Sequence, residues 1–172
     1  MSAPAIYQLT IKNFRGVQHL VWRPGSGVNV ILGGGDVGKT TILDAIALLL
    51  SPTYSTALAD TDYHKRQVDE GFVVEAVMKV PPEMGINEQS RQMWPWHWDG
   101  TEAVVPADPG DEITTNDPVY CFRVRGTAEF DLAYEAIQPD GTIGSSLFDV
   151  GSVTGTDVDM WFGVGMACLG SS

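Results

Sequence analysis

The sequence predicts an α/β fold in which a mixed sheet surrounds a glycine-rich loop and its helix, followed by an antiparallel β meander. Three observations support this class. A glycine-rich loop at 33–40 stands between an apolar, strand-like run at 28–32 and an apolar, helix-like run at 39–51. Two further strand-like segments precede the run at 28–32. Three more follow the helix. The chain is therefore expected to be organised around the loop.

The loop meets the phosphate-loop (Walker A) spacing G-x-x-x-x-G-K-[ST] in full. Its residues are Gly33, Gly34, Gly35, Asp36, Val37, Gly38, Lys39 and Thr40. Glycine lets backbone N–H groups approach phosphate oxygens without a Cβ in the way. Lys39 is expected to contact the β- and γ-phosphates, and Thr40 to ligate Mg²⁺. Thr41 is placed to donate to the α-phosphate, and the helix directs its positive dipole end at the same group. A plain glycine turn before a buried helix would not explain Lys-Thr at this spacing.

Composition limits the partners that this chain binds by itself. Its 172 residues are 44% hydrophobic, which suits one domain or part of one. The net charge of −12 argues against binding nucleic acid through phosphate contacts of this chain alone, although a larger assembly could do so. Cys121 and Cys168 fit no metal-ligand spacing; a reduced cytoplasmic protein is expected, with a disulfide left open. We expect no signal peptide and no membrane span.

Local patterns define the first elements. Residues 5–14 alternate apolar and polar side chains, which predicts a half-buried strand; a second strand is expected over 17–22, after a turn. The run 28–32 is expected to form a third strand that leads into the loop. The helix at 39–51 is apolar almost all round, with only Asp44 interrupting it, so we expect it to be covered on several sides.

The position of the loop is informative. In small nucleotide kinases and GTPases the phosphate loop usually follows the first strand, whereas here about two strands precede it. This layout resembles the heads of ABC-type ATPases. The polar segment 52–70 is expected to be a linker, with His64 on the surface. The alternative is that Gln67 acts as the Q-loop glutamine of that class, which senses Mg²⁺ and the γ-phosphate.

Strands are also expected at 71–80, 119–125 and 130–137, where they form an antiparallel meander. The segment 81–117 is expected to be irregular. It holds tryptophans at alternate positions: Trp94, Trp96 and Trp98. They could stack on bases, but the acidic residues over 102–112 favour an aromatic edge packed on the domain, or a partner contact.

The sequence predicts two parts, an ATPase-head part at 1–142 and a tail at 143–172. No lysine or arginine follows Arg125, and the tail is rich in Gly, Ser and Val. Asp157 and Asp159 form a D-x-D pair of the kind that binds Mg²⁺ in nucleases. Without a strand and a partner glutamate nearby, a flexible acidic loop is the favoured interpretation.

Three stretches together carry a family resemblance: Ile11–Gly16, the phosphate loop, and Thr41–Ile46. The chain resembles the ATPase head of the OLD (overcoming lysogenization defect) family, within the RecF-, SMC- and ABC-like ATPases, over about residues 5–137. The resemblance implies that ATP and Mg²⁺ are the cofactors and that Arg15 lies near the nucleotide phosphates. It also implies a dimer or larger ATPase assembly linked to DNA repair, DNA processing or phage defence.

Departures from the family indicate an incomplete domain. Gly35 stands where many members have asparagine, which removes a side-chain hydrogen bond. No Walker B strand, signature motif or C-terminal Toprim nuclease domain is found in the sequence. The chain is therefore expected to be the N-terminal half of a split head, through truncation or a frameshift near 143. It should bind Mg-ATP but hydrolyse it slowly, and reach DNA only through missing parts or partners.

The alternative is a non-catalytic regulatory or interaction module that partners a complete ATPase, for example through Trp94–Trp98. A small-molecule kinase is disfavoured by the two strands before the loop.

Overall fold

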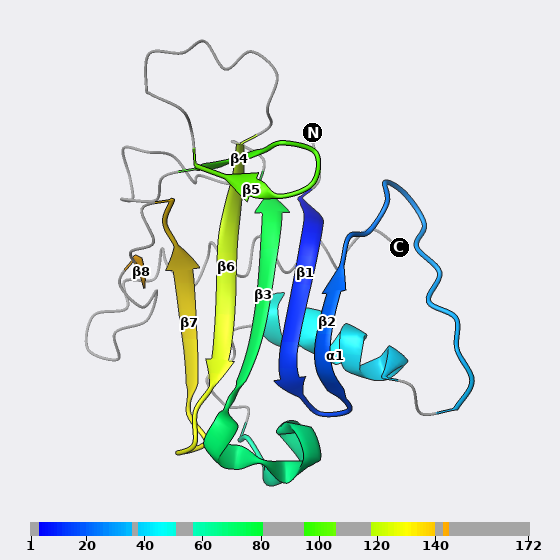
Figure 1. Ribbon diagram of the computed structural model, residues 1–172, viewed down its shortest axis with the longest axis vertical. Helices are drawn as coiled ribbons and strands as arrows, with labels where there is room; N and C mark the ends of the chain where they lie inside the picture. Colours follow the sequence, from blue (N-terminus) through cyan, green and yellow to red (C-terminus); the bar gives the residue numbers. More distant parts are fainter. Residues whose placement is uncertain are drawn as a thin grey trace.

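A single helix packs across one face of an antiparallel sheet in the computed structural model, which describes residues 4–35, 38–50, 57–80, 95–105, 118–139 and 143–144 (Figure 1). The helix is α1 (Lys39–Leu50). The strands are β1 (Ala5–Phe14), β2 (Val17–Trp22), β3 (Phe72–Lys79), β4 (Trp96–Trp98), β5 (Ala103–Val104), β6 (Pro118–Gly126), β7 (Leu132–Ile137) and β8 (Ile143–Gly144).

The sheet runs in the order β2-β1-β3-β6, with β7 and then β8 on the far side of β6. Every strand pairing in the described residues is antiparallel. The strands predicted before the loop and after the helix are confirmed as β1, β2, β3, β6 and β7. The last of these begins at Leu132 rather than at Phe130, because Phe130 has a φ of 63° and closes the turn onto Thr127.

The main core lies between the sheet and α1. Side chains alternate across a strand, so every second residue of β3 points toward the helix. Val74, Ala76 and Met78 are at most 1% exposed on this face. From α1, Ala45 and Leu49 are completely buried against them. The amphipathic packing of one helix face on the sheet fixes where the loop before the helix must lie.

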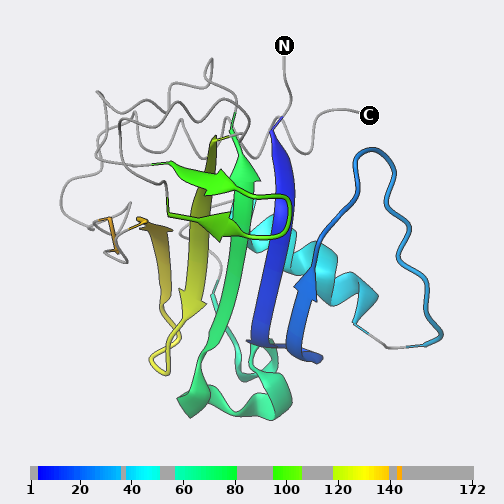
Figure 2. The same ribbon diagram turned by 45° about the horizontal axis from the view of Figure 1, so that its top comes forward.

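A small second core covers part of the other face of the sheet. It is built on Val77, Val119 and Cys121, and the β4–β5 hairpin lies over it (Figure 2). Trp96 and Trp98 are half-buried there, and the Trp96 indole donates a 2.8 Å hydrogen bond to the carbonyl of Ile137. The expectation of a packed aromatic edge is confirmed for these two tryptophans, whereas Trp94 lies outside the described residues. The hairpin itself was not predicted.

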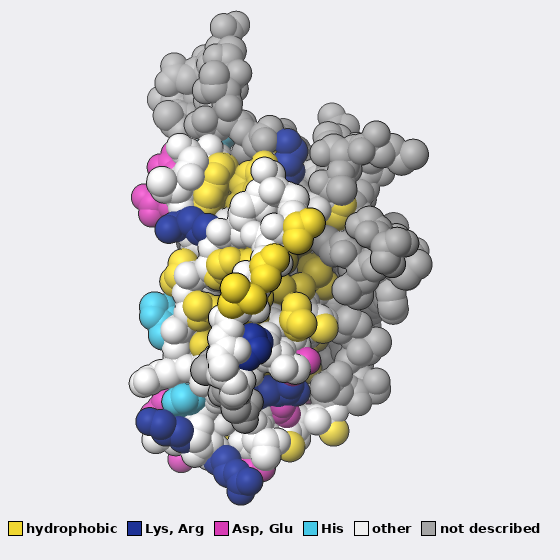
Figure 3. Space-filling model, turned by 90° about the vertical axis from the view of Figure 1, so that its right-hand side faces the viewer, with side chains coloured by type: hydrophobic (Ala, Val, Ile, Leu, Met, Phe, Trp, Pro, Cys, Tyr) yellow, Lys and Arg dark blue, Asp and Glu magenta, His cyan; other side chains and the backbone are white. Residues whose placement is uncertain are grey.

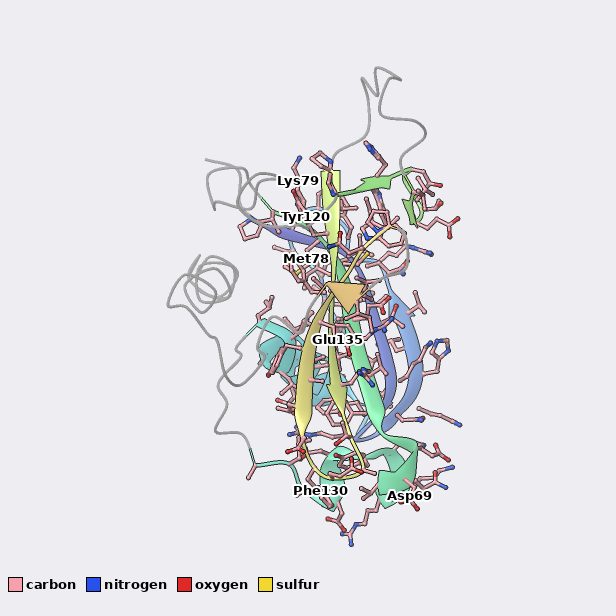
Figure 4. All side chains as sticks on the ribbon, turned by 90° about the vertical axis from the view of Figure 1, so that its left-hand side faces the viewer. Asp69, Met78, Lys79, Tyr120, Phe130 and Glu135 are labelled. Atoms are coloured by element: carbon pink, nitrogen blue, oxygen red, sulfur yellow. The ribbon has the colours of Figure 1, made fainter. Side chains whose placement is uncertain are left out.

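A ladder of charged side chains occupies the rest of that second face. Glu75, Arg123 and Glu135 lie opposite one another on β3, β6 and β7. The Arg123 guanidinium is 2.7 Å from the Glu75 carboxylate and 3.7 Å from that of Glu135, which is almost fully buried. Arg125 also bonds Glu135, and this hydrogen bond raises the pKa of Arg125. Figure 4, seen from the β7 side, shows α1 and the hairpin on opposite sides of the sheet, with Glu135 near the middle of its length.

The predicted strand at 28–32 is wrong. These residues run away from the sheet after β2 (Figure 1), and the side chains of Val28, Val30 and Leu32 are 93%, 72% and 85% exposed. A strand needs a neighbour to take up its backbone hydrogen bonds, and no described residue pairs with this segment. Instead the Asn29 amide closes a local loop onto Gly25. The parallel part of the expected mixed sheet is therefore not confirmed.

The expected polar linker contains three short 3₁₀ turns: η1 (Asp60–Asp62), η2 (His64–Arg66) and η3 (Val68–Glu70). They lie at the end of the sheet where the β1–β2 and β6–β7 turns also lie (Figure 1). Beyond β8, the tail and its Asp157 and Asp159 lie outside the described residues, so the division at 142 stays a prediction. Within the described part of the chain, no helix has the length and apolar character needed to cross a membrane.

Candidate functional site

The glycine-rich loop runs directly into the N-terminus of α1. The first helical hydrogen bond runs from the Ile42 N–H to the Gly38 carbonyl at 3.1 Å, so the preceding N–H groups of the first turn have no acceptor within the helix. Gly35 and Gly38 have positive φ values of 56° and 83°. A Cβ on Gly38 would also lie 3.1 Å from the Val17 methyl group. The left-handed backbone therefore favours glycine at Gly38, and the Val17 methyl group would have to shift to accept a side chain there.

Lys39 folds back over the loop. Its ammonium donates to the carbonyls of Gly33 at 2.7 Å and Gly35 at 3.0 Å. These contacts hold a positive charge over the exposed glycines, where the sequence predicts the phosphates. Thr40 is exposed beside it, as a metal ligand would need to be, while Thr41 is buried. Asp36 and Val37 lie outside the described residues.

Arg15 lies in the β1–β2 turn with a left-handed backbone (φ 47°). Its Nε donates to the Asp62 carboxylate at 2.9 Å, and its Nη1 forms an ion pair with Asp44 of α1. The next residue, Gly16, approaches the Thr41 hydroxyl: a Cβ there would be 3.8 Å away. The turn therefore lies against the first turn of α1. The resemblance implied that Arg15 lies near the phosphates; direct contact with a nucleotide stays a prediction.

The 3₁₀ segment attaches to the same turn through its backbone. The Arg15 N–H donates to the Asp62 carbonyl at 2.9 Å, and His64 Nδ1 lies 3.0 Å from the Arg15 carbonyl. An isolated β-bridge joins Phe14 to Tyr63. Burial, and then the nearby Asp62 charge, raise the pKa of Tyr63, whose neutral hydroxyl donates to a backbone carbonyl in the β6–β7 turn.

Sequence reasoning did not find Asp44 and Asp62 as partners of Arg15. The only available signal was that Asp44 interrupts an otherwise apolar helix. Gln67 is exposed between η2 and η3, so its role toward Mg²⁺ stays a prediction. Among the described residues, no three or more His, Cys, Asp or Glu side chains gather into a metal-binding group. A metal at this site would depend on Thr40 and on the nucleotide itself.

An exposed apolar face adjoins the site. Figure 3, which views the molecule from the side of β2 and the 23–35 segment, shows hydrophobic side chains gathered across the middle of this face. The large exposed hydrophobic residues of the segment are Val28, Val30 and Leu32, and α1 adds Leu43, which is 61% exposed. The expectation that α1 is covered on several sides is therefore wrong within the described residues: the sheet covers one side only.

In sequence, this chain is similar to AAA-type domains and to proteins of the RecF and SMC kind. Residues 8–88 match a family model described as an AAA domain. The DNA replication and repair protein RecF of Nitrosococcus oceani is 46% identical over 44 residues, which are 26% of this chain and 12% of RecF. Structural maintenance of chromosomes protein 5 of Arabidopsis thaliana is 35% identical over 71 residues, 40% of this chain and 7% of that protein. The chain thus spans only a small part of these relatives.

Solved structures extend the likeness to most of the chain. One comes from structural biochemistry of ATP-driven dimerization and DNA-stimulated activation of SMC ATPases; it has a TM-score of 0.55 at 15% identity and covers 94% of this chain and 79% of that one. The Smc head domain with a coiled coil and joint from Pyrococcus yayanosii has a TM-score of 0.52 at 15% identity, over 95% of this chain and 26% of that one. At this identity the solved structures show the fold alone; together with the family model and the two sequence relatives they support an ABC/SMC-like ATPase head, and membership of the OLD family stays a prediction.

Proposed function

We propose that this chain is the ATP-binding portion of a RecF- or SMC-type ATPase head and takes part in DNA processing in the cytoplasm. One observation carries the proposal: a phosphate-loop motif that is complete in the sequence leads into α1, and the Lys39 ammonium is held by the Gly33 and Gly35 carbonyls. The nucleotide phosphates would replace the Gly33 and Gly35 carbonyls as partners of that ammonium. Thr40 and the phosphates would share Mg²⁺, which neutralises charge on the phosphates when bound.

We further propose that this portion acts together with the parts of an ATPase head that supply a Walker B strand and a signature motif. Three large apolar side chains of the 28–32 segment are exposed beside the loop, and its backbone lacks a strand partner among the described residues. Slow hydrolysis by this chain alone follows from the sequence, in which no Walker B strand or signature motif is found. The ATP-driven dimerization attributed to SMC ATPases supports assembly on nucleotide. An OLD-like role in phage defence is the narrower version of this proposal.

Calorimetric titration with Mg-ATP tests the proposal directly. Lys39→Ala should abolish measurable binding, because it removes the charge that faces the phosphates. Lys12→Ala is the matched control, since Lys12 is an exposed lysine on β1 with no part in the loop. Equal binding by wild type and Lys39→Ala, or none by wild type, would contradict the proposal. Turnover at ordinary ATPase rates by the purified chain would contradict the proposed incompleteness.

A further inference from the structure

Arg15, Asp44 and Asp62 form a three-residue cluster beside the loop, here called the arginine clamp. The two carboxylates come from different elements: Asp44 from α1, and Asp62 from η1. The Arg15 backbone N–H also donates to the Asp62 carbonyl, so Asp62 holds both the side chain and the backbone of Arg15. The clamp therefore joins the β1–β2 turn, helix α1 and the 3₁₀ turn η1 at one point.

The clamp leaves part of the guanidinium available. Arginine has five N–H donors in a planar fork, and the two carboxylates use Nε and Nη1. The Arg15 side chain is 41% exposed, so the remaining donors can reach solvent or a ligand. The turn that carries Arg15 lies close to the site: a Cβ added to Gly16 would be 3.8 Å from the Thr41 hydroxyl, and one added to Gly38 would be 3.1 Å from a methyl group of Val17, which follows the turn. A planar fork that is already oriented loses little freedom when it binds an anion.

We propose that Asp62 is a positioning residue for nucleotide binding, and that it couples the phosphate loop to the 57–71 segment. This inference rests on the proposed function, because it assumes that phosphates bind at the loop. The Asp62 carboxylate fixes Arg15 at the edge of the loop, and phosphate contact by Arg15 in turn favours the ordered 3₁₀ turns. By linkage, the two effects must be reciprocal: nucleotide stabilises the segment as much as the segment strengthens nucleotide binding.

Calorimetry on the full chain tests the coupling. Asp62→Asn should weaken Mg-ATP binding about fivefold, the low end of measured couplings. Asp60→Asn is the matched control, because Asp60 lies on the same 3₁₀ turn but pairs with the exposed Arg66 at 3.6 Å. It should leave the affinity unchanged. In an Arg15→Ala background, Asp62→Asn should have no further effect, since it acts through Arg15.

Hydrogen exchange supplies the second readout. Mg-ATP should slow amide exchange over 57–71 in the wild type and in Asp60→Asn, but not in Arg15→Ala or Asp62→Asn. Unchanged affinity in Asp62→Asn, or an effect that persists without Arg15, overturns the proposal while the binding lost in Lys39→Ala still upholds the proposed function. Absence of binding by wild type overturns both. Should Asp62→Asn fail to fold, Asp44→Asn applies the same affinity test from the α1 side of the clamp.

Discussion

Strand β3 and the 28–32 segment are both apolar runs that contain valines, yet most side chains of the first are buried and most of the second are exposed. In β3, Val74 and Met78 are completely buried, whereas Val28 and Val30 are 93% and 72% exposed. The difference lies in their neighbours. β1 and β6 pair with the two edges of β3, and α1 covers one face. Apolar composition shows that a segment can be buried, but the rest of the chain decides whether it is.

The largest test of this contrast places the same charge in both segments. Val74→Asp should prevent folding. It buries an unpaired carboxylate and removes core packing, and the two costs together exceed the net stability of a typical domain, which is roughly 5–15 kcal/mol. Val30→Asp should change the free energy of unfolding by no more than about 0.5 kcal/mol, as exposed substitutions usually do. Urea denaturation followed by tryptophan fluorescence measures both.

A cooperative loss of structure in Val30→Asp would show that the segment is packed in this chain and would break the comparison. With the complementary part of a head present, the expectation reverses. Val30→Asp should then weaken assembly, because the segment would be buried in that complex.

A smaller effect is expected at the loop glycines. Gly38→Ala should cost about 2 kcal/mol, since a left-handed backbone penalises a side chain by about 1–2 kcal/mol and the new Cβ would press on Val17. Gly27→Ala is the matched control: it has a φ of 90° but no atom within 4 Å of the added Cβ, so it should show the backbone strain alone.

The double variant Val17→Ala with Gly38→Ala should recover part of the difference, because it removes the methyl group in contact. Chemical denaturation gives the stabilities, and Mg-ATP calorimetry shows whether the loop still binds. Equal costs at Gly38 and Gly27 would mean that the Val17 contact relaxes freely.

Sequence reasoning succeeded where the signal was local. β1 and β6 carry their alternation within themselves, and β3 is a contiguous apolar run that ends before two prolines; the phosphate loop is contiguous too, and its nucleotide stays a prediction. It failed where the answer depended on a distant partner. Arg15 and Asp62 are 47 residues apart, and the charge ladder needs the register that sets Arg123 opposite Glu75. The β4–β5 hairpin has strands of three and two residues, too short for a period to be recognised.

The smallest expected effect concerns the second core, at Cys121 under the hairpin. Burial, with a smaller contribution from Glu75, raises the pKa of this thiol from 9.0 to about 12. Between these values the folded chain keeps a proton that the unfolded chain releases, so stability is complete below pH 9 and falls as pH rises. The loss attributable to Cys121 should reach about 1 kcal/mol at pH 10.

Cys121→Ser is the control for the other groups that titrate in this range, because its hydroxyl does not ionise there. The difference between the two unfolding curves, measured in a Cys168→Ser background at pH 8 and pH 10, isolates the thiol. A difference that does not change with pH would mean that water reaches Cys121 and that the hairpin opens readily. The second core under the hairpin would then be open to water, as the apolar side chains of the 28–32 segment are.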